Sequence, residues 1–168
     1  MAVLWLVGMM GAGKTTVGRL AAGRLGLPFV DLDDEVAVAA GKPVAGVFAA
    51  EGEAGFRSRE AAAVAAAAAG GAAVVACGGG VVVNPASVAV MRAAGMVAWL
   101  EAPAAVLWAR VGTGEGRPLL AGGLGALERL LTAREAVYAA AAHCRLRTAG
   151  WSPEEVAEEV VRRWSEYS

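Results

Sequence analysis

The sequence has few of the residues on which disulfide-rich, zinc-binding and nucleic-acid-binding domains depend. It contains two cysteines, two lysines and one histidine, and its formal charge is −1 at pH 7. Because Cys77 and Cys144 belong to no CxxC or Cys/His cluster, we expect core cysteines in a reducing cytoplasm, with neither disulfides nor zinc. A chain without a basic field is not expected to bind nucleic acid through bulk charge.

Charged residues are also missing from positions 61–91, a stretch longer than the roughly 20 residues that span a bilayer. Five glycines and the pair Asn84-Pro85 interrupt it, which favours a helix, a turn, a short strand and a glycine loop over a membrane span. The apolar run 1–8 lacks a basic region and a cleavage site, so it is typical of a buried first strand. We therefore expect no membrane partner.

Short apolar runs alternate with longer helical stretches, and this alternation predicts an α/β protein with a parallel sheet. The predicted strands are 3–7, 29–31, 73–77, 96–100 and 143–148. The predicted helices are 14–24, about 34–40, 53–69, 86–94, 104–110, 124–142 and 153–167. Because 168 residues is a typical length for one domain, we expect a single domain over residues 1–168.

One segment, 112–125, fits neither pattern, because six of its residues are glycine and one is proline. A glycine-rich stretch of this length inside a compact domain is usually either functional or disordered. Since it carries Arg117, we expect a mobile lid over a ligand site.

The clearest motif is G-x-x-x-x-G-K-T at residues 8–15, directly after the first predicted strand and at the start of the first helix. Its glycines let backbone N–H groups converge on phosphate oxygens, and the helix start adds its dipole. We expect Lys14 at the β- and γ-phosphates and the Thr15 hydroxyl at Mg²⁺, a cation that keeps several waters and needs few protein oxygens. The motif predicts ATP with magnesium as the ligand.

All three aspartates of the chain, Asp31, Asp33 and Asp34, follow the second predicted strand. The carboxyl ends of strands face the ligand crevice of a parallel sheet, and alternation along a strand would place Asp31 and Asp33 on one side. One carboxylate could support the metal while the other orients or deprotonates an acceptor hydroxyl. The alternative is that these acids only favour a helix start, which is the better explanation for Asp34 and Glu35.

Two further features are less specific. Arg57 and Glu60 share a helix face, so the Glu60 carboxylate could orient the Arg57 guanidinium toward a carboxylate ligand. A solvated salt bridge explains the spacing equally well. Three glycines at 78–80 follow the third predicted strand. They permit a ligand to approach the backbone closely, or they form a tight turn.

In this order, the motifs resemble those of the shikimate kinase family across nearly the whole chain. They are GMMGAGKTT at 8–16, the pair Asp31-x-Asp33, GExxFRxxE at 52–60, GGG at 78–80 and RPLL at 117–120. The resemblance implies a three-layer P-loop kinase fold, like that of nucleoside monophosphate kinases, with a five-stranded parallel sheet in order 2-3-1-4-5. It also implies ATP-dependent phosphorylation of the shikimate 3-hydroxyl on the route to chorismate and aromatic amino acids, and we expect a monomer.

The resemblance implies roles for individual residues as well. The nucleotide-binding residues are Gly11, Ala12, Gly13, Lys14, Thr15, Thr16, Arg110, Arg117 and Pro153, with Trp151 nearby. The substrate-binding residues are Asp33, Arg57, Glu60, Gly78, Gly79, Gly80 and Arg134. The residues at the metal are Thr15 and Asp31, and the catalytic residues are Asp33, Lys14 and Arg117. Arg57 and Arg134 would hold the substrate carboxylate, and Arg117 would swing in with the lid to the transferring phosphoryl group.

Two residues depart from the family pattern. Leu32 stands between the aspartates, where the family usually has a small polar residue, and His143 matches no family site. A kinase for another small acid, such as gluconate or an aminated relative of shikimate, is an alternative, because two arginines indicate a carboxylate and not a particular ring. A nucleotide-binding module without transfer activity is the non-enzymatic alternative, although no motif is visibly disabled.

Overall fold

The computed structural model describes residues 2–112 and 121–168. Its centre is a parallel sheet of five strands in the order β2-β3-β1-β4-β5, as the sequence predicted. The strands are β1 (Val3–Val7), β2 (Phe29–Asp31), β3 (Val74–Ala76), β4 (Gly95–Glu101) and β5 (Cys144–Arg147). The register is continuous across the middle of the sheet, where Leu4 of β1 pairs with Val74 of β3 and with Met96 of β4.

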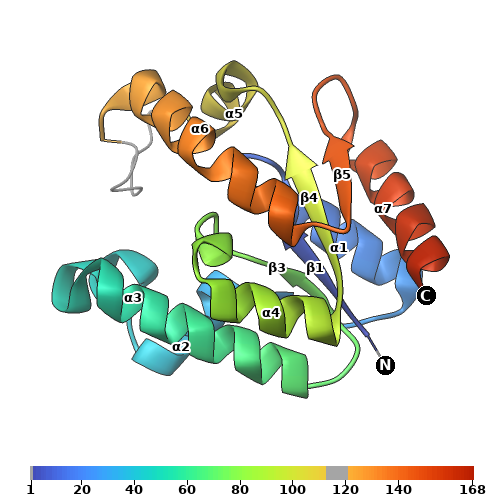
Figure 1. Cartoon of the computed structure of the whole chain (residues 1–168), viewed down its shortest axis with the longest axis horizontal. Coiled ribbons are helices and arrows are strands. Elements are labelled where there is room, and N and C mark those ends of the chain that lie inside the picture. The colour runs from blue at the N-terminus through green and yellow to red at the C-terminus, as the bar shows by residue number, and fades with distance from the viewer. Residues whose placement is uncertain (1, 113–120) are drawn as a thin grey trace.

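Helices cover both faces of this sheet and give three layers (Figure 1). The helices are α1 (Lys14–Leu25), α2 (Leu32–Ala40), α3 (Val44–Ala69), α4 (Pro85–Ala94), α5 (Ala104–Val111), α6 (Gly123–Ala141) and α7 (Pro153–Tyr167), with a short 3₁₀ helix η1 (Val81–Val83). Helices α1 and α7 pack together on one face, while α3, α4 and α6 lie on the other. The three-layer P-loop kinase architecture is therefore confirmed.

The core explains why β1 and β4 are almost entirely apolar. All five residues of β1 are buried, because helices exclude water from both faces of the sheet. Trp5 and Trp99 are fully enclosed in this core, and Leu32, the departure from the family pattern, is buried in it as well. Within the described residues, no helix combines the length and apolarity needed to cross a membrane.

Two predicted boundaries were wrong. Helix α3 begins at Val44, nine residues before the predicted start, and Gly52 with φ 71° bends it in the middle. The added turns hold Val47, which packs with Val36 and Phe56 in a small second core. Helix α6 begins at Gly123 and so includes the last residues of the segment 112–125 that we expected to be irregular.

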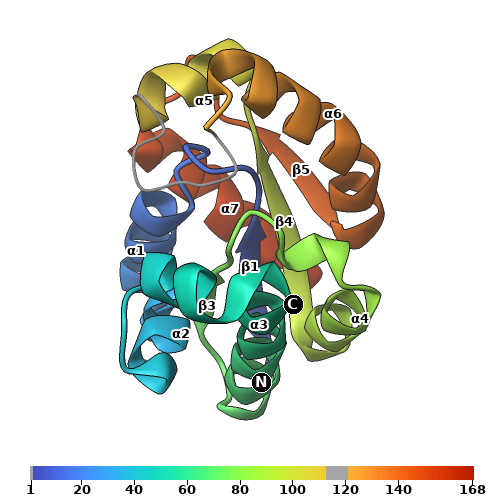
Figure 2. The same cartoon turned by 90° about the vertical axis from the view of Figure 1, so that its left-hand side faces the viewer.

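The loops that follow β1 and β3 lie next to each other at the end of the sheet bordered by α5 and α6 (Figure 2). A Cβ atom on Gly79, in the loop after β3, would lie 3.7 Å from the backbone of Gly8 and of Met10 in the loop after β1. The fold thus brings two glycine-rich segments, about 70 residues apart, into one site at the carboxyl ends of the strands.

Candidate active site

The loop at 8–15 requires glycine at several positions. Gly8, Gly11 and Gly13 have φ values of 148°, 83° and 94°, which side chains rarely adopt. A Cβ atom on Gly8 would also lie 2.3 Å from the carbonyl oxygen of Leu100. Lys14 folds back over this loop, and its Nζ donates hydrogen bonds to Gly8 O at 2.7 Å and to Met9 O at 3.0 Å.

The two aspartates come together by a different route from the one predicted. Asp31 is the last residue of β2 and Leu32 already belongs to α2, so strand alternation does not align Asp31 with Asp33. Instead Asp31 caps α2, and its Oδ1 accepts a hydrogen bond from the Asp33 N–H at 3.0 Å. Its other oxygen accepts one from the Thr15 hydroxyl at 2.9 Å.

A cavity of about 290 Å³ gathers these groups. Its lining includes residues from the first glycine loop, both aspartates, Thr16, and the start of the second glycine loop at Gly78 and Gly79. The predicted phosphate site and the predicted acceptor site therefore form one continuous space.

Arg57 and Glu60 form a partly buried ion pair and not the solvated one that the sequence left open. Arg57 Nη1 donates to Glu60 Oε1 at 2.9 Å, and only 3% of the Glu60 side chain is exposed. Burial raises the pKa of the Glu60 carboxyl, against the opposing effect of the Arg57 guanidinium. The second oxygen, Oε2, is buried and has no hydrogen-bond partner within the described part of the chain.

The glycines at 78–80 lie directly against this charged cluster. A Cβ atom on Gly78 would lie 2.7 Å from Glu60 Oε2 and 3.2 Å from Asp33 Oδ1. One on Gly80 would lie 2.2 Å from Arg57 Nη2. A tight turn is present too, since Val81 N donates to Gly78 O at 3.2 Å, but the turn alone does not explain three glycines. Their small size lets two carboxylates and a guanidinium approach the backbone.

Arg134 of α6 completes this end of the site. The residue is 6% exposed, and its Nη1 is a buried donor without a hydrogen-bond partner among the described residues. Nη1 lies 3.5 Å from the position that a Cβ atom on Gly79 would take. A buried guanidinium with an unused N–H is suited to a ligand that supplies a negatively charged acceptor, such as a carboxylate.

Sequence reasoning missed Tyr138, which lies one helical turn after Arg134. Its hydroxyl donates a hydrogen bond to the carbonyl oxygen of Gly79. Burial raises the pKa of this phenol to about 12, with Arg134 opposing the shift, so the hydroxyl keeps its proton at neutral pH. The spacing i, i+4 from Arg134 was the available signal, because it puts both side chains on one face of a helix.

A second cavity, of about 350 Å³, borders the phosphate loop on the other side. Its lining includes Arg110, Trp151 and Pro153, all three predicted to lie near the nucleotide. Arg110 Nη1 donates to Gly11 O at 3.0 Å and to Thr148 Oγ1 at 3.2 Å, so it joins α5 to the loop. Sequence reasoning missed Thr148. Arg117 and most of the predicted lid lie outside the described residues.

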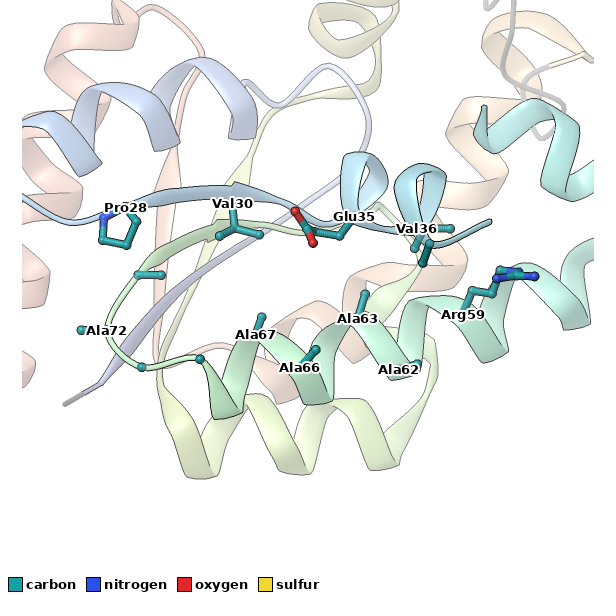
Figure 3. Close-up of a pocket in the computed structure, with 14 residues that line it drawn as sticks. Pro28, Val30, Glu35, Val36, Arg59, Ala62, Ala63, Ala66, Ala67 and Ala72 are labelled. Carbon is teal, nitrogen blue, oxygen red and sulfur yellow. The ribbon is translucent and has the colours of Figure 1, made fainter. Parts of the chain in front are cut away.

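A groove of about 530 Å³ lies away from these residues, between β2, α2 and α3 (Figure 3). Ala63 and Ala67 of α3 face Val30 and Val36 across it. The groove follows from the alanine-rich sequence of α3, whose short side chains leave space beside the sheet edge. Among the residues that the structure describes, no predicted site residue lines it.

Comparison with known proteins gives matches over nearly the full length. A family model described as shikimate kinase matches residues 10–165. A shikimate kinase of Symbiobacterium thermophilum is 49% identical over 166 residues, which is 96% of this chain and 95% of that protein. A solved shikimate kinase from Acinetobacter baumannii in complex with shikimate has a TM-score of 0.94 and 32% identity, covering 99% of this chain and 94% of its own. One from Aquifex aeolicus vf5 has a TM-score of 0.84 and 30% identity, covering 95% and 94%.

Proposed function

Because the chain belongs to the shikimate kinase family, we propose that it transfers the γ-phosphoryl group of ATP to the 3-hydroxyl of shikimate, giving shikimate 3-phosphate and ADP. The observation that carries this proposal is the pair of arginines beside the second glycine loop. Arg57 and Arg134 approach Gly80 and Gly79, and Arg134 has a buried N–H without a partner in the described part. A carboxylate would satisfy that donor, and shikimate carries one.

In this proposal the acceptor hydroxyl lies beside Asp33, at the boundary between the phosphate loop and the arginine pair. Support comes from the cavity that Asp33 shares with Lys14 and Gly78. Asp33 would accept a hydrogen bond from the hydroxyl and hold its oxygen in line with the γ-phosphorus. A loose transition state needs little help from a base, so positioning is the larger part of this role.

At the phosphate end, Lys14 would leave the loop carbonyls for the β- and γ-phosphates, whose charge it partly neutralises. Backbone N–H groups of Gly11 to Thr16 would supply the remaining contacts. Adenine would occupy the cavity bordered by Arg110, Trp151 and Pro153. We assign Arg117 to the transferring phosphoryl group in the closed enzyme, so that Arg117→Ala lowers kcat more than it raises the KM for shikimate.

Thr15 and Asp31 are the residues that would hold Mg²⁺. The Thr15 hydroxyl and an Asp31 carboxylate oxygen lie 2.9 Å apart next to the phosphate loop, which fits a cation that prefers oxygen ligands and keeps several waters. Bound magnesium would reduce the charge repulsion between the phosphates and the acceptor oxygen. Because the Thr15 hydroxyl donates its proton to Asp31, both of its lone pairs stay available to a cation.

One experiment tests the proposed function directly. Purified protein with ATP and Mg²⁺ is expected to release ADP when shikimate is added and to form shikimate 3-phosphate. Comparing kcat/KM for shikimate, an aminated shikimate and gluconate then separates the cyclic acids from the open-chain acid. A preference for gluconate, or ADP release no faster than without an acceptor, would overturn the proposal.

We also propose that the enzyme acts as a monomer in the cytoplasm and needs neither nucleic acid nor membrane. Sedimentation at the concentration of the activity assay tests this, and activity confined to a dimer would contradict it.

A further inference from the structure

Tyr138 connects the helix that carries Arg134 with the glycine loop after β3. The residue is fully buried, and its ring stacks on Trp99 of β4 with centroids 5.5 Å apart and planes 19° from parallel. Its hydroxyl leaves this apolar contact and donates to Gly79 O. A phenol held by stacking on one side and by a hydrogen bond at its tip has little freedom to move.

Arg134 and Tyr138 reach the same glycine from one face of α6. Tyr138 binds the carbonyl oxygen of Gly79, while Arg134 Nη1 lies 3.5 Å from where a Cβ atom on that glycine would be. They are four residues apart, so their side chains are neighbours on the helix. The loop position and the arginine position are therefore coupled through one hydroxyl group.

The glycine loop needs such a tether. Three consecutive glycines have more conformational freedom to lose than any other tripeptide, and the described bonds inside the loop are the turn bonds Val81 N to Gly78 O and Val83 N to Gly80 O. Neither of these bonds uses the carbonyl of Gly79. The Tyr138 hydroxyl satisfies this carbonyl and at the same time selects one orientation of the Gly79–Gly80 peptide.

We propose that Tyr138 is a positioning residue for the acid substrate: it fixes the Gly78–Gly80 backbone relative to Arg134, so that both reach one bound shikimate. This inference rests on the proposed function. Tyr138 acts through the loop and through Arg134 and does not itself contact the reacting atoms. The adenine cavity shares no residue with this tether, whereas the phosphate-loop cavity shares Gly79, so the effect falls on the acceptor side and leaves the adenine contacts unchanged. Preorganisation of this kind strengthens substrate binding and leaves the chemical step nearly unchanged.

Tyr138→Phe is the test, because phenylalanine keeps the ring that stacks on Trp99 and removes only the hydroxyl. We expect the Kd and KM for shikimate to rise about tenfold, the effect of one lost buried hydrogen bond. The kcat and the KM for ATP are expected to stay within about twofold of the wild type. Tyr167→Phe is the matched control, since Tyr167 is the other tyrosine of the chain and lies 43% exposed on α7.

Two further measurements separate positioning from simple stabilisation. The first is a double-mutant cycle of Tyr138→Phe and Arg134→Lys. Together the two substitutions are expected to raise the shikimate Kd by less than the product of their separate factors, because each disturbs the same contact. Amide hydrogen exchange of residues 78–80 without substrate should accelerate in Tyr138→Phe. A lower Tm with an unchanged shikimate Kd would reduce Tyr138 to a structural residue and overturn the inference.

The outcomes also distinguish this inference from the proposed function. If the wild type phosphorylates shikimate and Tyr138→Phe has the same KM for shikimate, the positioning role alone is overturned. A wild type that releases no ADP with shikimate removes the proposed function, and the inference falls with it. If Tyr138→Phe does not fold, the wild type still decides: shikimate must slow the amide exchange of Gly80 and ADP alone must not, and equal protection of Gly80 by both ligands overturns the inference.

Discussion

Gly80 and Arg57 lie so close together that any side chain at position 80 would displace the Arg57 guanidinium. A Cβ atom built on Gly80 would lie 2.2 Å from Arg57 Nη2 and 2.5 Å from its Cζ. Gly80 has φ −101°, a value open to any residue, so the site requires the absence of a side chain and not a special backbone conformation. The guanidinium that pairs with Glu60 is thus packed directly on the backbone of the second glycine loop.

Gly80→Ala is therefore expected to displace Arg57 and weaken its ion pair with Glu60. Because a shift of about 1 Å in a substrate-binding group can cost a hundredfold, we expect the kcat/KM for shikimate to fall by at least about tenfold. ATP affinity, measured by calorimetry, should remain unchanged. Gly23→Ala is the control: a Cβ atom there meets nothing within 4 Å, and alanine in a helix interior adds about 0.5–1 kcal/mol of stability. Wild-type kinetics in Gly80→Ala would refute this packing argument.

Asp33→Asn tests the assignment of the acceptor site. The substitution keeps the shape of the side chain and removes its negative charge, so we expect ATP binding to persist while phosphoryl transfer falls by about two orders of magnitude or more. Single-turnover measurement of product formation separates the chemical step from binding. Asp34→Asn makes the same chemical change one residue later, on the exposed start of α2, and is expected to keep nearly full activity. Equal turnover in the two variants would show that Asp33 has no such role.

The fold was largely predictable from sequence because its signals are local. The phosphate loop follows a strand and opens a helix, and β1 and β4 are apolar because both faces of the sheet are covered. The start of α7 was equally plain: Ser152 and Glu155 form a capping box, in which each binds the other's backbone N–H, and Pro153 stands at the first helical position.

What could not be predicted depends on contacts between distant residues. Tyr138 and Gly79 are 59 positions apart. The spacing of Tyr138 from Arg134 indicates a shared helix face, but no local pattern indicates that the hydroxyl meets a carbonyl. The early start of α3 follows from packing of Val47 in the second core, a tertiary contact that overrides the local pattern around Gly52. Asp31 lies in one cavity with Asp33, as expected, but the argument for it was incorrect, because helix capping and not strand alternation determines its orientation.

The buried carboxyl of Glu60 should make stability depend on pH. Its pKa is raised in the folded state from an ordinary value near 4.5, so the folded protein binds this proton more tightly than the unfolded chain does. The resulting stabilisation is fully present below the unfolded pKa and is lost as pH rises through the folded pKa. Between about pH 4 and pH 7, the free energy of unfolding of the wild type is therefore expected to decrease relative to that of Glu60→Gln, which cannot titrate.

Urea denaturation at about pH 4, 5.5 and 7 measures this difference. Glu53→Gln is the matched control. Glu53 is the second ion-pair partner of Arg57, and its side chain is 59% exposed. Removing its charge should lower the free energy of unfolding by no more than about 0.5 kcal/mol. A difference between the wild type and Glu60→Gln that stays constant with pH would contradict the raised pKa of Glu60.

Trp151 provides a direct test of the nucleotide cavity. Its side chain lines that cavity with 49% of its surface exposed, whereas Trp5 and Trp99 are buried in the core. We expect ADP to change the tryptophan emission of the wild type, and Trp151→Phe to abolish most of that change. Because stacking of a base on an aromatic ring is worth about 1–3 kcal/mol, Trp151→Ala should raise the Kd for ADP about tenfold and leave the KM for shikimate unaltered.

Trp164→Phe is the control. It removes a tryptophan that packs against Tyr167 instead, and should keep the ADP-dependent change in emission. If the ADP-dependent change survives in Trp151→Phe but disappears in Trp164→Phe, the base does not bind beside Trp151, and the adenine site must be sought away from Arg110 and Pro153.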